Sequence, residues 1–498
     1  MLRILGSERR LCDGLTRREL IHAGGLGMLG IGLEDYFRLK ETHAAPTETY
    51  NAPFGQAKSC IFLYPYGSPP QHETFDPKPE APAEIRGDLG PIAGSVPGTY
   101  VGELMPNIAK VMDRVTAVRS MTHPYPVHCT AYVVSGIPTY SVPLEVKPRD
   151  PQHWPYIGSV VDYVLDHRAD RRPLEIPRNM ALPWKMNKHS GNVVFAGPWA
   201  AFLGTAYDPV LTEFAGKATR VVRKQDPAGG PFYDVHDPYA GISPDDYLRL
   251  EGTEPKEQMT IDRFQRRQSL LEQFDDSRGR FERDASTRGY DRYRQMAVSM
   301  MTSPRMREAL DLSRESMSRR ERYGMTLFGQ SCLTARRLVE AGSKFVTVFW
   351  DEYGLNSNSD WDLHWDQTRR LKEWLMPGFD LGFSGLIRDL DERGLLDETL
   401  VVWLSEHGRT PRFNGNGGRD HWSRVYSVAL AGGGVARGKL IGESDANGGD
   451  VKSNPVSPKD ILATIYYLLG IDPHATVPDL VGRPMPIAGS GVLRPELF

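Results

Sequence analysis

The sequence has little cysteine, no long apolar run and almost no net charge. Its net charge of −3 and pI near 6.5 argue against a nucleic-acid-binding surface and give no electrostatic reason for membrane binding. No stretch reaches the ~18 apolar residues of a transmembrane helix, so we expect no integral membrane segment in the mature chain. The wide spacing of the cysteines fits neither a zinc ribbon nor a disulfide framework. They are Cys12, Cys60, Cys129 and Cys332.

The N-terminal 46 residues have the pattern of an export signal. Thr16–Leu20, "TRREL", resembles the twin-arginine signal, and the apolar run from about Leu20 to Leu33 is too short to span a bilayer. We therefore expect residues 1–46 to be read by the twin-arginine export machinery, and the protein to be periplasmic or extracellular. The alternative is a cytosolic amphipathic helix that carries a chance Arg-Arg pair.

The remaining residues, 47–498, contain enough apolar side chains for a large folded core. Hydrophobic residues make up 40% and charged residues 25% of the 498-residue chain. Continuously apolar strands alternate with helical patterns, which predicts a single α/β domain with a mostly parallel central sheet and helices on both faces. We expect loops and short helices over residues 140–240. The charged helical pattern at about 254–325 is expected to be a helical insertion with a solvated face. The predicted strands are 58–66, 115–121, 344–350, 398–406 and 425–434, and the main helices are 325–342, 365–394 and 457–470.

Acidic and histidine side chains follow these predicted strands. In open α/β sheets, ligands bind beyond the carboxyl ends of the strands, so these side chains are expected to line one shared site. Imidazole and carboxylate suit zinc and similar divalent ions, whereas harder ions prefer carboxylates alone. The residues in question are His72, Glu73, Asp76, His123, His128, Asp351, Asp360, Asp362, His364, Glu406, His407, Asp420 and His421.

Each of these residues also has a simpler interpretation. Glu406 has Arg409 nearby as a partner, and Asp420 has Arg419 beside it. An isolated surface histidine usually carries no function. The argument for a metal site therefore rests on four clusters together, one after each of the predicted strands 58–66, 115–121, 344–350 and 398–406.

The order of motifs resembles the alkaline-phosphatase and sulfatase superfamily. It resembles more closely the exported bacterial family catalogued as domain of unknown function 1501, from the N-terminal signal to about residue 485. The resemblance implies an alkaline-phosphatase-like fold. It further implies one metal site of Asp360 or Asp362 with His364 and His421, and a second with Glu406 and His407. The stretches that carry the resemblance include "GELMPNIAKVMDRVTAVRSMTH", "WDLHWD", "LLDETLVVWLSEHGRTPRFN" and "GRDHW".

Two departures from the superfamily pattern concern the reacting groups. The first strand ends "YPYGSPP" without the expected metal-binding acid, whose place would be taken by His72, Glu73 or Asp76, or by nothing. The nucleophile is not fixed: "PVHCTAYVVSG" offers three candidates at a predicted helix start, where an anion would be favoured. Cys129 lacks the arginine that formylglycine conversion requires, because Val133 stands there. The candidates are His128, Cys129 and Thr130.

The sequence thus predicts an exported hydrolase of sulfate or phosphate esters. One or two divalent ions (Zn, Ca, Mn or Mg) would polarise the ester of a small molecule or glycan. Arg409 or Arg419 would clamp the oxyanion, and Asp420 would orient a neighbouring histidine. The rival interpretation is a catalytically degenerate relative that acts as a binding or scaffold protein for sulfated or phosphorylated glycans.

Overall fold

The computed structural model describes most of the chain beyond its N-terminus. The chain divides into two units, Met1–Ala52 and Pro53–Phe498, and every described residue belongs to the second. The predicted signal segment, Asp360 and most of the predicted helical insertion therefore lie outside the described residues. These are 53–136, 147–150, 153–168, 175–189, 196–225, 231–250, 292, 296, 303–354 and 361–498.

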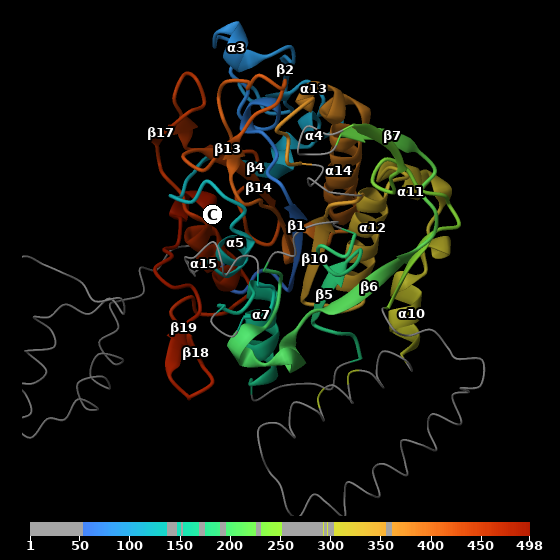
Figure 1. The fold of residues 1–498 in the computed structure, drawn as a ribbon. Coiled ribbons are helices and arrows are strands. Elements are labelled where there is room, and N and C mark those ends of the chain that lie inside the picture. Colours follow the sequence, from blue (N-terminus) through green and yellow to red (C-terminus); the bar gives the residue numbers. More distant parts are fainter. Residues whose placement is uncertain are drawn as a thin grey trace, which may run out of the picture. The chain divides into compact units, whose positions relative to one another are not determined.

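A nine-stranded sheet forms the centre of the described chain (Figure 1). Strand β1 pairs in parallel with β10 and β11, and the parallel pairing continues through β5 to β6. Only β14 and β9 run against their neighbours within this sheet. The order is β15 (Leu440–Ile441), β4 (Val115–Met121), β14 (Tyr426–Ala431), β11 (Thr399–Trp403), β1 (Ser59–Pro65), β10 (Phe345–Trp350), β5 (Asn179–Leu182), β6 (Val210–Ala215) and β9 (Tyr247–Leu250).

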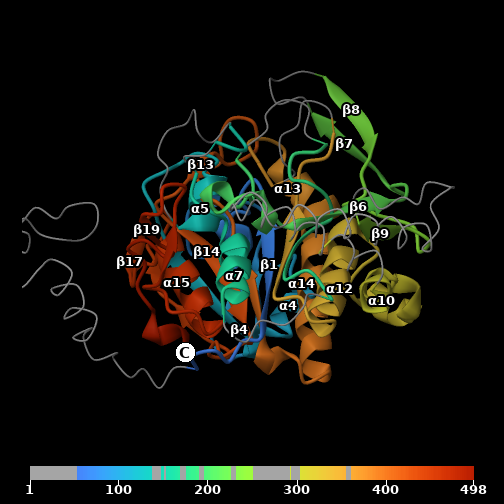
Figure 2. The ribbon, with the colours of Figure 1, turned by 90° about the horizontal axis from the view of Figure 1, so that it is seen from below.

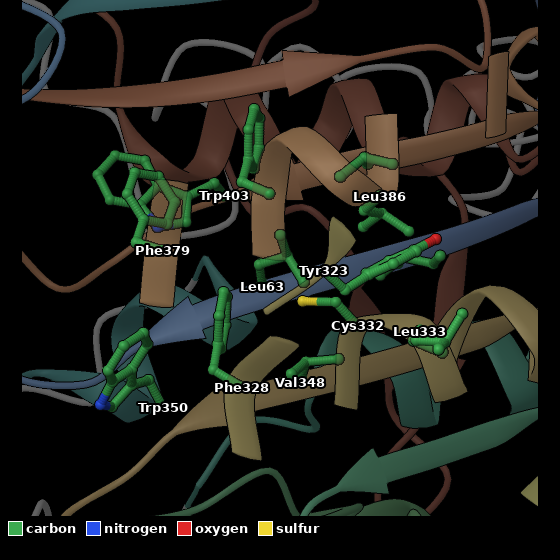
Figure 3. Packing of buried hydrophobic residues seen from close by; sticks show 14 of the residues in the cluster. Leu63, Tyr323, Phe328, Cys332, Leu333, Val348, Trp350, Phe379, Leu386 and Trp403 are labelled. Carbon is green, nitrogen blue, oxygen red and sulfur yellow. The ribbon is translucent and has the colours of Figure 1, made fainter. Parts of the chain in front are cut away.

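Helices cover both faces of this sheet, so its central strands β1, β10 and β11 are buried at every position. Ile61 and Leu63 of β1 pack with α12 (Leu327–Glu340) and α14 (Met376–Glu392). Figure 3 shows Leu63 among the aromatic side chains of that layer. The alternate residues of β1 point to the other face, which α5 (Thr130–Ser135), α7 (Ile157–Asp166) and α15 (Pro458–Leu468) cover (Figure 2). The predicted α/β class with a mostly parallel sheet is confirmed.

The prediction of loops and short helices over residues 140–240 is wrong in part. Strands β5 and β6 extend the parallel sheet, and β7 (Val221–Gln225) and β8 (Phe232–His236) form an antiparallel hairpin. These strands are short and lie between proline- and glycine-rich segments, so neither their length nor their periodicity distinguishes them from loops. The partner of β5 is also distant in sequence, because β5 lies beside β10.

The other described elements are short, and none of the described helices is long and apolar enough to span a membrane. A single π-helical segment, η7 (Leu371–Leu375), joins α13 (Gln367–Arg370) to α14. The remaining helices are η2 (Gln71–Glu73), α3 (Ala83–Arg86), α4 (Pro106–Ala109), η3 (Met112–Arg114), η4 (Ala201–Leu203), η5 (Thr205–Tyr207), α10 (Pro304–Leu310), η6 (Leu312–Arg314), α11 (Met317–Arg322), η8 (Leu396–Glu398) and η9 (Pro495–Leu497). The remaining strands are β2 (Pro91–Ala93), β3 (Tyr100–Gly102), β12 (Gly408–Arg409), β13 (His421–Trp422), β16 (Glu443–Ser444), β17 (Val451–Ser453), β18 (Thr476–Pro478) and β19 (Pro484–Pro486).

Candidate metal centre

Histidine and acidic side chains converge at the carboxyl ends of the parallel strands. Glu406 and His407 lie just beyond β11, and His421 lies on β13, which pairs with β12. His128 precedes α5, which lies at the same end of the sheet as β13 (Figure 2). This is the edge at which open α/β sheets bind ligands.

One group of possible ligands consists of Asp362, His364 and His421. The Nε2 atoms of the two histidines are 3.0 Å apart, and each lies 3.1 Å from Asp362 Oδ1. The Nδ1 of His364 lies 2.7 Å from Asp420 Oδ1, so the carboxylate accepts the Nδ1 proton and leaves the lone pair on Nε2. Two nitrogen lone pairs 3.0 Å apart repel each other unless a proton or a cation lies between them.

His407 belongs to a second group with His128 and His421. Its Nδ1 is 2.8 Å from the carbonyl oxygen of Gly408, which can only accept, so Nδ1 carries the proton. Its Nε2 therefore presents a lone pair, and it is buried without a hydrogen-bond partner among the described residues. The side chain is 1% exposed, and burial, followed by the charges of His421 and Arg409, holds the pKa of His407 well below its usual range.

His128 lies between two carboxylates. Its Nε2 is 3.4 Å from Asp362 Oδ2, and its Nδ1 is 3.3 Å from Glu406 Oε1. Burial alone would lower the pKa of His128, but Asp362 and Glu406 outweigh it and raise the pKa to about 10. His421, whose ring centre is 4.5 Å away, shows the opposite balance: burial lowers its pKa to about 4 despite the contact with Asp362.

The carboxylate of Glu406 is fully buried and accepts hydrogen bonds from a backbone amide and two side-chain hydroxyls. The Gly67 amide and the hydroxyls of Ser68 and Ser405 donate to it at 3.1, 3.4 and 2.6 Å. Burial would raise the pKa of Glu406, but its contact with His128 and the Ser405 hydrogen bond lower it. Sequence reasoning missed Ser68 and Gly67, because only folding brings the end of β1 beside Glu406.

The three residues considered as replacements for the missing first-strand acid have other partners. His72 Nε2 is 2.8 Å from the carbonyl oxygen of Asn447, and Glu73 forms a 2.7 Å ion pair with Arg419. Asp76 bonds to the Ser444 hydroxyl. None of the three occurs in the two groups of possible ligands, and donors to Glu406 follow β1 where the acid was expected.

Arg409 does not have the surroundings expected of an oxyanion clamp. Its side chain is fully buried, and Nη2 lies 2.5 Å from Asp362 Oδ1. With Arg409 and His128 nearby, the pKa of Asp362 stays well below its usual range even though burial would raise it. Arg419 is equally buried and paired with Glu73. The other acceptors of Arg409 are the carbonyl oxygens of Gly67, Ser68, Trp361 and Arg419.

Thr130 and Cys129 also lie away from the position of an attacking group. Thr130 is completely buried, and its Oγ1 accepts a 3.2 Å hydrogen bond from the Tyr64 hydroxyl. The thiol of Cys129 is directed at backbone carbonyl oxygens, 3.9 Å from that of Glu406. Of the three candidates, only His128 places its side chain among the convergent histidines and carboxylates.

The two loops that supply the histidines are joined backbone to backbone. The Arg419 amide donates to the carbonyl oxygen of Leu363 at 2.8 Å, and Trp365 forms a bridge with Gly417. Asn414 Nδ2 binds both the carbonyl oxygen of His364 and the carboxylate of Asp420. The "NGNGG" segment, residues 414–418, therefore permits the close approach of the two backbones, and its glycines are the sequence signal for this contact.

Replacing Gly418 by alanine is expected to destabilise the protein by about 1–3 kcal/mol. A Cβ at this position would lie 2.1 Å from the carbonyl carbon of His364, so the two loops would have to separate. Denaturant unfolding measures the change in free energy. Gly415→Ala is the matched control, because a Cβ there meets nothing within 4 Å. Equal stability of the two variants would contradict this packing.

Comparisons with solved structures give only distant similarities. The protein in the crystal structure of Ps i-CgsB is 12% identical in sequence to this chain. The match covers 84% of this chain and 72% of that chain, with a TM-score of 0.37. A sulfatase from Pseudoalteromonas sp. is 12% identical (87% and 70% covered, TM-score 0.33). A phosphonate monoester hydrolase from Silicibacter pomeroyi is 11% identical (87% and 77% covered, TM-score 0.32). Similarities this distant assign no activity to the chain, and no curated protein matches it.

A family model gives a more specific result. The model described as a protein of unknown function, DUF1501, matches residues 57–497. The match spans the central sheet and both loops of the candidate centre, and it confirms the membership predicted from the order of motifs. The chain therefore belongs to the DUF1501 family of proteins of unknown function.

Proposed function

We propose that the protein is a metal-dependent hydrolase of phosphate or sulfate esters, with its reacting centre at the convergent histidines. The observation that carries the proposal is the buried, unpartnered Nε2 of His407 beside His421. A buried polar atom without a partner destabilises a fold by about 1–3 kcal/mol, so its retention favours a ligand at this point. Imidazole nitrogens with one carboxylate suit zinc or another borderline divalent ion better than calcium or magnesium.

The arrangement favours one ion rather than two. His421 belongs to both groups of possible ligands, and a neutral imidazole has only one nitrogen lone pair, which binds a single ion. A second ion would be left with two imidazoles and Glu406, whose oxygens already accept hydrogen bonds from Gly67, Ser68 and Ser405. Asp362, His364 and His421 would hold the ion, and His407, whose ring centre lies 4.4 Å from that of His421, is a further candidate ligand.

The remaining side chains would prepare the site for hydrolysis. A bound ion would polarise the ester oxygen and lower the pKa of an attacking water. Asp420 keeps the His364 proton on Nδ1, and Arg409 fixes the Asp362 carboxylate. His128, held by Asp362 and Glu406, could keep a proton beside the leaving group.

The substrate would be an ester of a small molecule or glycan, met outside the cytoplasm. Export by the twin-arginine machinery to a periplasmic or extracellular location remains part of this proposal, on the evidence of the N-terminal "TRREL" motif. The second candidate function is a binding or scaffold protein. The burial of Thr130 and Arg409 favours this second function. Neither residue is free to act, Thr130 as a covalent nucleophile or Arg409 as an oxyanion clamp.

Turnover of 4-nitrophenyl phosphate and 4-nitrophenyl sulfate separates the two functions. We expect the metal-loaded chain to hydrolyse at least one of them, to stop with a chelator and to recover when the ion is restored. Thr130→Val should retain the rate, because the lost hydroxyl bonds only to Tyr64 among the contacts found for it. If Thr130→Val keeps its metal but loses turnover, Thr130 would instead be identified as the nucleophile. Bound metal without turnover of any ester would favour the binding protein.

A further inference from the structure

A cationic cleft lies next to the candidate centre, between the β7–β8 hairpin and the start of α13. In Figure 2 these elements lie at the same end of the sheet as β13. The lining combines four cationic side chains with two aromatic rings and contains no carboxylate. Its main residues are Arg223, Lys224, Arg369, Arg370, Trp365 and Tyr233.

The cleft is continuous with the centre. Trp365 directly follows His364, and the guanidinium of Arg370 lies 5.6 Å from the centre of the Trp365 ring. Arg370 also donates to the carbonyl oxygen of Asp362 at 3.2 Å. A ligand in the cleft would therefore touch side chains that neighbour two of the possible metal ligands.

The positive charge of the cleft is only partly neutralised. Lys224 pairs with the buried Asp237 at 2.6 Å, and Arg369 pairs with Asp366 at 2.5 Å and with Glu373 at 2.9 Å. Arg223 is exposed and has no carboxylate within ion-pair distance in the part of the chain described. Its guanidinium lies 5.1 Å from the ring centre of Phe232, and Arg369 Nη2 fixes its backbone through a 3.0 Å hydrogen bond.

We propose that this cleft binds a sulfate or phosphate group of an acidic oligosaccharide whose ester lies at the candidate centre. Guanidinium groups bind such oxyanions through paired hydrogen bonds, and flat aromatic faces pack against sugar rings. The inference rests on the proposed function, since it names the part of the substrate beside the reacting ester.

An adjoining hollow favours a saccharide over a nucleic acid. It has a volume of about 490 Å³, and Asp234, Asp366 and Glu373 line it together with Arg223 and Phe232. Carboxylates accept hydrogen bonds from sugar hydroxyls but repel a chain that carries a phosphate at every residue. The net charge of −3 also disfavours the binding of a nucleic acid.

The test uses a hexasaccharide that carries a sulfate on every second sugar and no carboxylate, and the same hexasaccharide without sulfate. Isothermal titration of the full chain at low salt should show binding of the sulfated probe and little of the unsulfated one. Arg223→Ala should weaken binding about tenfold through the loss of a charge-assisted contact, without changing the metal content. Arg307→Ala on α10 is the control, since Arg307 is exposed and also forms no ion pair among the described residues.

The outcomes separate this inference from the proposed function. Bound metal and ester turnover, with equal affinity of wild type and Arg223→Ala for the sulfated probe, would overturn the cleft assignment alone. If the chain bound no metal but Arg223→Ala still weakened binding of the sulfated probe tenfold, the hydrolase proposal would be overturned and the cleft assignment retained. Equally tight binding of a single-stranded oligonucleotide would overturn the saccharide assignment.

Discussion

Replacing His421 by alanine is expected to lower the affinity of the centre for a divalent ion more than about 100-fold, and turnover with it. Loss of a residue that only orients a ligand already reduces affinity about 10–100-fold. His421 should matter more, because it belongs to both groups of possible ligands and its Nε2 lies 3.0 Å from His364 Nε2. Competition with a chromogenic chelator measures the dissociation constant.

A second histidine provides the control for this experiment. His474 is exposed and distant in sequence from the candidate centre, so His474→Ala should bind the ion like the wild type. The free energy of unfolding of both variants, measured without metal, shows whether the fold is intact. If His421→Ala kept wild-type affinity, the ligand set would be wrong, whatever its turnover.

The second large effect is expected at Arg409, whose replacement by alanine should destabilise the protein by about 3–5 kcal/mol. The substitution leaves the buried carboxylate of Asp362 without its 2.5 Å partner. It also removes the donor that binds the carbonyl oxygens of Gly67 and Ser68 at the end of β1. Lysine would not restore these contacts, because an ammonium group cannot reproduce the planar fork.

Arg412→Ala, in the same loop, is the matched control. The side chain of Arg412 is 72% exposed, and its contact with Glu84 is 3.6 Å, so a change below about 0.5 kcal/mol is expected. Urea unfolding compares the two variants. Should Arg409→Ala fail to fold, the milder Arg409→Lys provides the comparison. A stability of Arg409→Lys equal to that of Arg412→Ala would show that Arg409 does not hold the centre together.

The sequence predicted the fold where the pattern of side chains is local. Strands β1, β10 and β11 are buried at every position, so each appears as a continuous apolar run. Strand β5 has four residues and is defined by its pairing with β10, which lies more than 150 residues later. No local pattern carries that pairing, so the sequence alone could not place β5.

For the candidate site, the sequence indicated positions better than roles. Spacing and strand ends indicated Asp362, His364, Glu406 and His421, which the structure brings close together; their metal-binding role stays a prediction. The partners of Arg409 could not be predicted, since they are carbonyl oxygens and a carboxylate from three separate loops. Whether an arginine binds a ligand or other residues of the protein depends on these long-range contacts.

Metal content tests the central claim most directly. The folded mature chain, purified without chelator and supplied with zinc or manganese, would be analysed by elemental mass spectrometry beside the His364→Ala, His421→Ala double variant. One equivalent is expected in the wild type and none in the double variant. Two equivalents would contradict the single shared ion. No bound metal in the folded wild-type chain after supplementation would contradict the metallohydrolase itself.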